Sequence, residues 1–176
     1  MASNQQHPVQ ESVVEQFLAG HRIAVVGASD DPKNFARTIY TELKAHGYEP
    51  VPVHPSAVSV DGDVVHHDVA SVPGSLDGVI IVVSADHAVG VVRECIDCGI
   101  DKIWLFQGLG GPGAASDEAV RTCAEAGVDV VPGACPLMFL EPVGWFHRVH
   151  RAARRGRHAL VVGSEPVVVA DRAVRV

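Results

Sequence analysis

The chain has 176 residues, a length typical of one domain of about 100–200 residues that forms its core without disulfides or metals. Apolar residues make up 47% and charged residues 20%, a globular composition that excludes a disordered or a membrane protein. The formal net charge of −7 argues against nucleic acid as a partner, because neutralising phosphates requires clustered cations. The one basic cluster is interpreted as a solvated helix face and comprises Arg148, Arg151, Arg154, Arg155 and Arg157.

The start of the chain and its cysteines indicate a cytoplasmic protein. Met1 to Pro8 is polar and lacks the basic and apolar regions of a signal peptide. The longest apolar run, Val79 to Val83, is far shorter than the roughly 20 residues that span a bilayer. Cys95 and Cys98 have no second Cys or His pair, so we expect packing cysteines and no metal.

Apolar runs alternate with helical patterns along the chain, and glycines or prolines separate them. In chain order we expect strand 22–27, helix 33–46, strand 49–53, a short segment around 64–69, strand 79–83, helix 86–98, strand 102–106, helix 116–126 and strand 128–131. The first helix carries Phe35, Ile39 and Leu43 on one face, and Pro132-Gly133 is expected to end the last strand.

Strands that are apolar throughout and alternate with helices indicate parallel pairing with both sheet faces covered. We therefore predict an α/β fold, a three-layer doubly wound Rossmann-like domain with a mostly parallel sheet, over residues 12–142. Residues 143–176 break this rhythm, with a helix over 143–155 and two short apolar stretches that form either a hairpin on an edge strand or a swapped arm. We expect a homodimer that uses the segment after Arg157.

In such a sheet, ligands bind beyond the carboxyl ends of the strands, where the strand order reverses. The first strand ends at Gly27-Ala28-Ser29, which is either a phosphate-binding turn or an ordinary strand-to-helix corner, since a full G-x-G-x-x-G is absent. Lys33 and Arg37 follow it, either as phosphate partners or as surface residues.

The second strand ends at Val53-His54-Pro55 without the carboxylate that holds the ribose of NAD, and without an arginine for NADP. The fourth ends in a glycine-rich segment, 107–113, which is either an anion-binding row of amides or a surface loop. Cys135 follows the last strand, and we interpret it as a structural cysteine because no base is placed beside it.

Four segments together resemble the small stand-alone CoA-binding proteins and the CoA-binding Rossmann domain of the succinyl-CoA synthetase alpha subunit. The resemblance runs from about Gly20 to Leu140, in the order and spacing of that family. The segments are Ile23-Ala24-Val25-Val26-Gly27-Ala28-Ser29, Gly47-Tyr48-Glu49-Pro50-Val51-Pro52-Val53-His54-Pro55, Lys102-Ile103-Trp104-Leu105-Phe106-Gln107-Gly108, and Ala126-Gly127-Val128-Asp129-Val130-Val131 with Cys135-Pro136.

The resemblance implies coenzyme A as the ligand and a binding site at the strand ends. Its residues are Gly27, Ala28, Ser29, Lys33, His54, Pro55, Ser84, Gln107 and Gly108. The chain departs from the family at three places. His54 stands where members often have Asn, Val83-Ser84 where many have an arginine, and Ala134 where an arginine commonly precedes the cysteine.

The resemblance therefore favours a protein that binds CoA or acyl-CoA and sequesters, senses or presents it, with no catalytic residues of its own. The second domain of the synthetase, with its phosphorylated histidine, has no counterpart, so acyl-CoA ligation by this chain alone is not expected. The alternative is an NAD(P)- or nucleotide-dependent enzyme, or a redox-sensing regulator, that uses the same strand ends.

Overall fold

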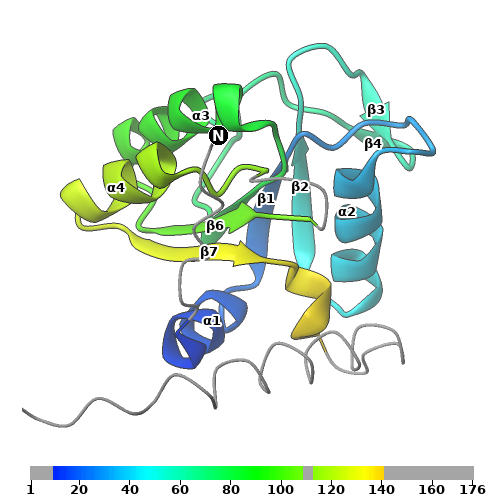
Figure 1. The fold of residues 1–176 in the computed structure, drawn as a ribbon. Coiled ribbons are helices and arrows are strands. Elements are labelled where there is room, and N and C mark those ends of the chain that lie inside the picture. The colour runs from blue at the N-terminus through cyan, green and yellow to red at the C-terminus, as the bar shows by residue number, and fades with distance from the viewer. Residues whose placement is uncertain (1–9, 109–112, 141–176) are drawn as a thin grey trace, which may run out of the picture. The chain divides into compact units, whose positions relative to one another are not determined.

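The computed structural model describes residues 10–108 and 113–140, all within one compact unit, Met1–Val143. Five parallel strands form its main sheet in the order β2-β1-β5-β6-β7 (Figure 1). The strand bounds are β1 Arg22–Val26, β2 Glu49–Val53, β5 Gly78–Ile81, β6 Lys102–Phe106 and β7 Asp129–Ala134. The order reverses between β1 and β5, so the predicted doubly wound α/β fold is confirmed.

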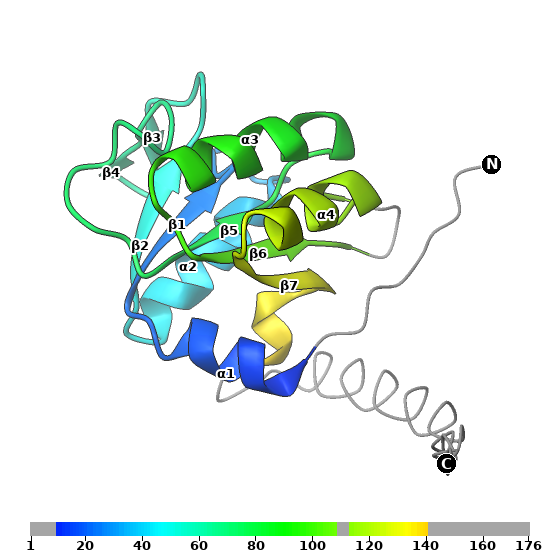
Figure 2. The ribbon, with the colours of Figure 1, turned by 90° about the vertical axis from the view of Figure 1, so that its left-hand side faces the viewer.

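Helices cover both faces of this sheet, as Figure 2 shows. Helices α3 (Ala85–Asp97) and α4 (Asp117–Glu125) pack on one face over Val26, Val79 and Ile81. On the other face lie α1 (Glu11–Leu18), α2 (Phe35–Ala45) and the 3₁₀ turn η1 (Pro136–Met138). Alternate residues of β1, β5, β6 and β7 enter the two cores, which explains why these strands are apolar almost throughout.

Helix α1 was not among the predicted elements. Its N-cap, Gln10, makes no side-chain capping bond, so the helix lacks a sequence signal at its start. Its buried residues, Val14 and Phe17, attach it to the sheet instead. The Phe17 ring lies edge-on to Trp104 with 5.3 Å between centroids, so packing rather than capping holds this helix.

The last strand is longer than predicted. We expected Pro132-Gly133 to end it, but β7 continues to Ala134. In the described part of the chain β7 pairs only with β6, so Pro132 withdraws no hydrogen bond from a second neighbour. Gly133 has φ of 70°, and the register shifts between Leu105 and Phe106 opposite it, as a bulge requires.

Between β2 and β5 lies a two-stranded hairpin, β3 (Ser59–Val60) and β4 (Asp63–Val64), which overlaps the predicted segment around 64–69 only at Val64. A single parallel bridge then joins Val53 to His66. The predicted helix 143–155, the apolar stretches after it, the dimer segment and the basic cluster lie outside the described residues. Within the residues described, no helix has the length and apolarity needed to cross a membrane.

Trp104 is fully buried, and its indole N–H donates to the carbonyl of Ala134 at 2.8 Å. We expect Trp104→Phe to lower the free energy of unfolding by about 1–3 kcal/mol, because a buried carbonyl loses its donor. Urea unfolding measures this, with Val64→Ala as the control, since Val64 is exposed and its loss changes stability by about 0.5 kcal/mol or less. Equal midpoints for the wild type and Trp104→Phe would contradict the prediction.

Candidate functional site

The backbones of β1 and β5 nearly touch where the two strands end. Gly27 has φ of 101°, and a Cβ on it would lie 2.4 Å from the carbonyl oxygen of Val82. Its N–H donates to Val53 of β2 at 2.8 Å, while the N–H of Val82 donates to Val26 at 2.9 Å. Gly27 is therefore required by the fold itself, at the point where the strand order reverses.

Asn34 holds the loop that leaves β1. It is the N-cap of α2, and its side-chain oxygen accepts from the N–H of Arg37 at 2.9 Å. Its side-chain nitrogen donates to the carbonyl of Gly27 at 2.8 Å. One side chain thus fixes the helix start to the predicted phosphate loop, so α2 begins at Phe35 and not at 33.

The loop presents unpaired donors beside this helix start. In the part of the chain that the structure describes, the backbone N–H groups of Ala28 and Ser29 donate to no protein acceptor. Ala28 is fully buried and Ser29 is half-buried. An unpaired amide in a loop that leads into a helix attracts anions, so this loop, through the half-buried Ser29, is a candidate phosphate site.

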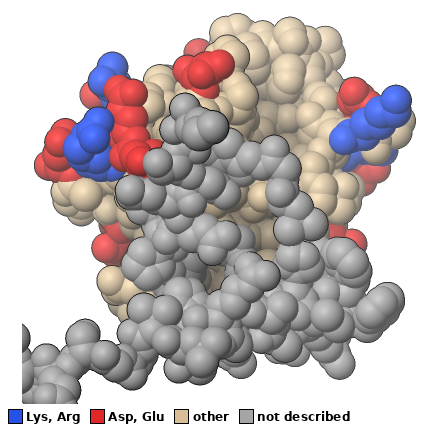
Figure 3. Space-filling view, viewed as in Figure 1, with Lys and Arg blue, Asp and Glu red and all other residues tan. Residues whose placement is uncertain are grey.

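A carboxylate ties the same loop to hairpin β3–β4. Asp30 accepts from the Ser59 hydroxyl at 2.7 Å and from the Asp61 N–H at 2.9 Å, and Arg37 lies 4.0 Å from it. These contacts lower the pKa of Asp30, the Asp61 N–H most strongly. Figure 3 shows blue and red side chains together at its right-hand margin, on the side where Figure 1 places this hairpin.

The predicted site residue Lys33 is exposed in the turn before α2, where its N–H donates to Asp31 at 2.8 Å. Within the described residues, its ammonium group has no side-chain partner. It is therefore available to an anion on the loop.

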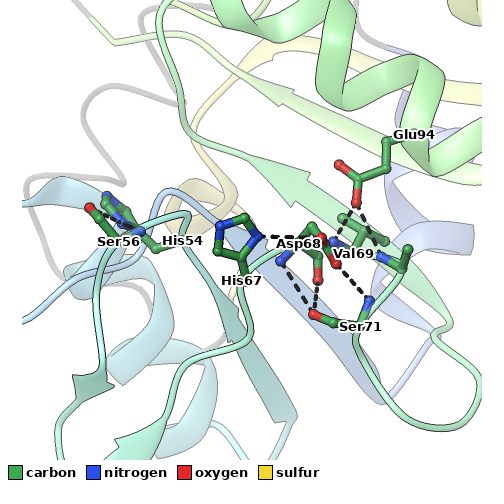
Figure 4. A network of polar contacts seen from close by, with 8 residues as sticks. His54, Ser56, His67, Asp68, Val69, Ser71 and Glu94 are labelled. Carbon is green, nitrogen blue, oxygen red and sulfur yellow. Dashed lines mark hydrogen bonds and ion pairs between the residues drawn. The ribbon is translucent and has the colours of Figure 1, made fainter.

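His54 closes the turn that follows β2 (Figure 4). Its Nδ1 accepts from the N–H groups of Ser56 and Ala57 at 3.2 and 3.1 Å, so the ring proton lies on Nε2. The imidazole therefore caps this turn as the side chain of asparagine does in an Asx turn. Pro55, beside it, is exposed.

A second network in Figure 4 holds the segment between β4 and β5. Glu94 of α3 accepts from the N–H groups of Val69 and Ala70 at 2.6 and 3.1 Å. Asp68 accepts from the N–H of Ser71 at 2.7 Å and lies 3.4 Å from His67. These groups are engaged in supporting the backbone, and they lie outside the set predicted to bind ligand.

The other predicted residues differ in their placement. Ser84 is the exposed N-cap of α3, and its hydroxyl lies 2.9 Å from Nδ1 of His87. Gln107 is buried, and its side-chain oxygen lies 2.7 Å from the place a Cβ on Gly133 would take. Its side chain is thus directed to Gly133 of β7, whereas Gly108 is exposed.

The cysteines differ in burial. Cys95 and Cys123 are buried in the core beside α3 and α4, and burial raises the pKa of Cys95 strongly and that of Cys123 to about 11. Cys98 is exposed, so our packing interpretation is wrong for it. Cys135 is half-buried at the start of η1. Across residues 10–108 and 113–140, no group of His, Cys, Asp and Glu is arranged to hold a metal ion.

Substitutions at Gly47 and Gly27 distinguish the cost of backbone strain from the cost of a steric clash, because both glycines have positive φ but only Gly27 has close neighbours. Gly47 has φ of 83°, and a Cβ on it would meet nothing within 4 Å, unlike a Cβ on Gly27. We expect Gly47→Ala to cost about 1–2 kcal/mol of unfolding free energy from strain alone. Gly27→Ala should cost about 1–3 kcal/mol more, because the Val82 backbone must move. Urea unfolding of both variants measures the difference, and equal losses would show that the contact is relieved without cost.

Comparison with known proteins places these features in a family. At 27% identity the chain is similar to the uncharacterized protein YneT of Bacillus subtilis, over 74% of this chain and 93% of that one. It is 29% identical to the alpha subunit of an ADP-forming acetate–CoA ligase II of Pyrococcus furiosus, over 62% of this chain. It spans only 24% of the length of that subunit.

A solved structure of a hypothetical protein from Pyrococcus horikoshii matches the fold with a TM-score of 0.68 at 24% identity. The match covers 81% of this chain and 96% of that one. The family model for the CoA binding domain matches residues 21–141, from just before β1 to just after η1. The chain therefore belongs to the CoA-binding domain family.

Proposed function

We propose that this protein binds CoA or acyl-CoA at the carboxyl edge of its sheet, with ligand phosphates on the Gly27-Ala28-Ser29 loop. The unpaired N–H of the half-buried Ser29, in the loop that Asn34 bonds to the start of α2, is the observation that carries this proposal. Family membership supports the choice of CoA among phosphate ligands. Asn34 fixes the loop before any ligand arrives, which lowers the entropy cost of binding.

The remaining members of the proposed site surround this loop. Lys33 supplies a cation close to the phosphates, and Ser84 supplies a hydroxyl at the end of β5. His54-Pro55 forms the neighbouring corner after β2. Gly108 offers an exposed backbone to the ligand at the end of β6. Gln107 contributes indirectly, because its side chain packs beside Gly133 and supports the end of β6.

The role we propose is sequestering, sensing or presenting the bound CoA, without catalysis by this chain alone. The alternative, an NAD(P)-dependent enzyme, finds little support at the end of β2. There His54 uses its Nδ1 on two backbone amides, and no carboxylate follows the strand to hold a ribose. Cys95 and Cys123 do not support a redox role, because burial keeps both thiols protonated at neutral pH.

Thermal unfolding with single ligands tests the proposal directly. CoA and acetyl-CoA should each stabilise the protein, by about 2.7 kcal/mol at a hundredfold excess over Kd. NAD, NADP and ATP should give clearly smaller shifts at the same concentrations. A shift with NAD but none with CoA would refute the proposal, and so would the absence of a shift with every ligand.

A matched pair of lysines tests the place of the site. Lys33 stands beside the loop, whereas Lys102 begins β6 at the opposite end of the sheet. We expect Lys33→Ala to weaken CoA binding by about fivefold at low salt, an effect that shrinks as salt screens the charge. Lys102→Ala removes the same charge and should leave affinity unchanged. Titration calorimetry measures both, and equal effects would place the phosphates elsewhere.

A further inference from the structure

One aromatic side chain is exposed beside the proposed site. The large apolar side chains exposed in the described part of the chain are Phe35, Val58 and Val64, of which Phe35 alone is aromatic. Phe35 is 42% exposed, although its four-residue spacing from Ile39 and Leu43 predicts that it shares their buried face. Those two residues are buried, so Phe35, the first residue of α2, lies at the end of the helix that leaves the core.

Phe35 is stacked on a second aromatic ring. The centroids of Phe35 and Phe106 lie 5.0 Å apart with an interplanar angle of 29°. Phe106 ends β6, and its ring lies 3.6 Å from the place a Cβ on Gly108 would take. Phe35 follows Asn34, whose side chain is bonded to Gly27. The Phe35–Phe106 pair therefore connects the start of the helix behind the phosphate loop with the end of β6.

The strand order indicates which half of the ligand lies near the Phe35–Phe106 pair. In doubly wound folds the adenosine half of a dinucleotide lies over the end of the second strand, next to the phosphate loop. Here that end belongs to β2, on one side of β1, whereas β5 and β6 lie on the other side. The half of the ligand beyond the phosphates is thus directed toward β5 and β6, where the Phe35–Phe106 pair lies.

We infer that the Phe35–Phe106 pair contacts the pantetheine arm of CoA and acyl-CoA, an inference that rests on the proposed function. The first part of this arm carries a geminal dimethyl group, which gains from leaving water against an aromatic surface. The phosphates and the ribose gain nothing from such a surface. Phe35 is accordingly a specificity residue that favours ligands with the arm over nucleotides without it.

The test compares CoA with 3′-phospho-ADP, which keeps the adenosine and phosphates but lacks the arm. We expect Phe35→Ala to weaken CoA binding by about tenfold while changing binding of 3′-phospho-ADP by no more than about twofold. Phe35→Leu, which keeps an apolar side chain, should recover most of the CoA affinity. Val58→Ala is the control, because it removes an exposed apolar side chain on the segment after β2.

Titration calorimetry on the full chain separates failure of this inference from failure of the proposed function. If the wild type binds CoA and Phe35→Ala weakens both ligands equally, or neither, the inference is wrong and the proposed function stands. If the wild type binds neither ligand, the proposed function is wrong and the inference falls with it. Thermal unfolding of Phe35→Ala without ligand checks that the variant is folded.

Discussion

The close approach of β1 and β5 at Gly27 is the constraint on which the site depends. The chain leaves β1 toward α2 on one face of the sheet and leaves β5 toward α3 on the other. The two backbones meet just before they diverge, so closely that a methyl group on Gly27 would lie 2.4 Å from the Val82 oxygen. Without a side chain there, the loop can pass the end of β5 and continue toward α2.

The position of the proposed phosphate donors is thus set by packing of the strands and by Asn34, not by a ligand. Asn34 occupies the Gly27 carbonyl and the first turn of α2 at once. Asp30 attaches the other side of the loop to hairpin β3–β4. A loop held at three points loses little conformational entropy on binding, which favours affinity from few contacts.

Most of the sheet could be predicted from sequence because parallel strands buried on both faces are apolar throughout. The bounds of β2 and β6 agree with the prediction, and α3 and α4 differ from it by a single residue at each end. The misses have local causes. Helix α1 is held by Phe17 against Trp104, a contact that sequence periodicity does not reveal. Strand β7 continues through Pro132 because the edge position tolerates the missing donor.

The candidate site, which stays a proposal, could be derived from the sequence only in outline. Strand ends indicated Gly27, His54 and Ser84, since the fold alone brings them to one edge of the sheet. Asn34 was missed, although an asparagine directly before an apolar helical pattern is a recognisable N-cap. The link from Asp30 to Ser59 and Asp61 joins residues about thirty positions apart, and no local pattern encodes it. Phe35 was misplaced because a four-residue period does not say which end of a helix leaves the core.

The aromatic contact between α1 and β6 also bears on how the protein is made. Trp104 touches Phe17 of the first described helix and donates its indole hydrogen to Ala134 of the last strand. During synthesis the amino-terminal part emerges first, at about 5–20 residues per second. Helix α1 has no tryptophan to pack against until β6 emerges, and that tryptophan has no acceptor until β7 follows. The core on this face is therefore completed only when nearly the whole unit has left the ribosome, and a nascent chain shorter than that exposes Phe17 to chaperones.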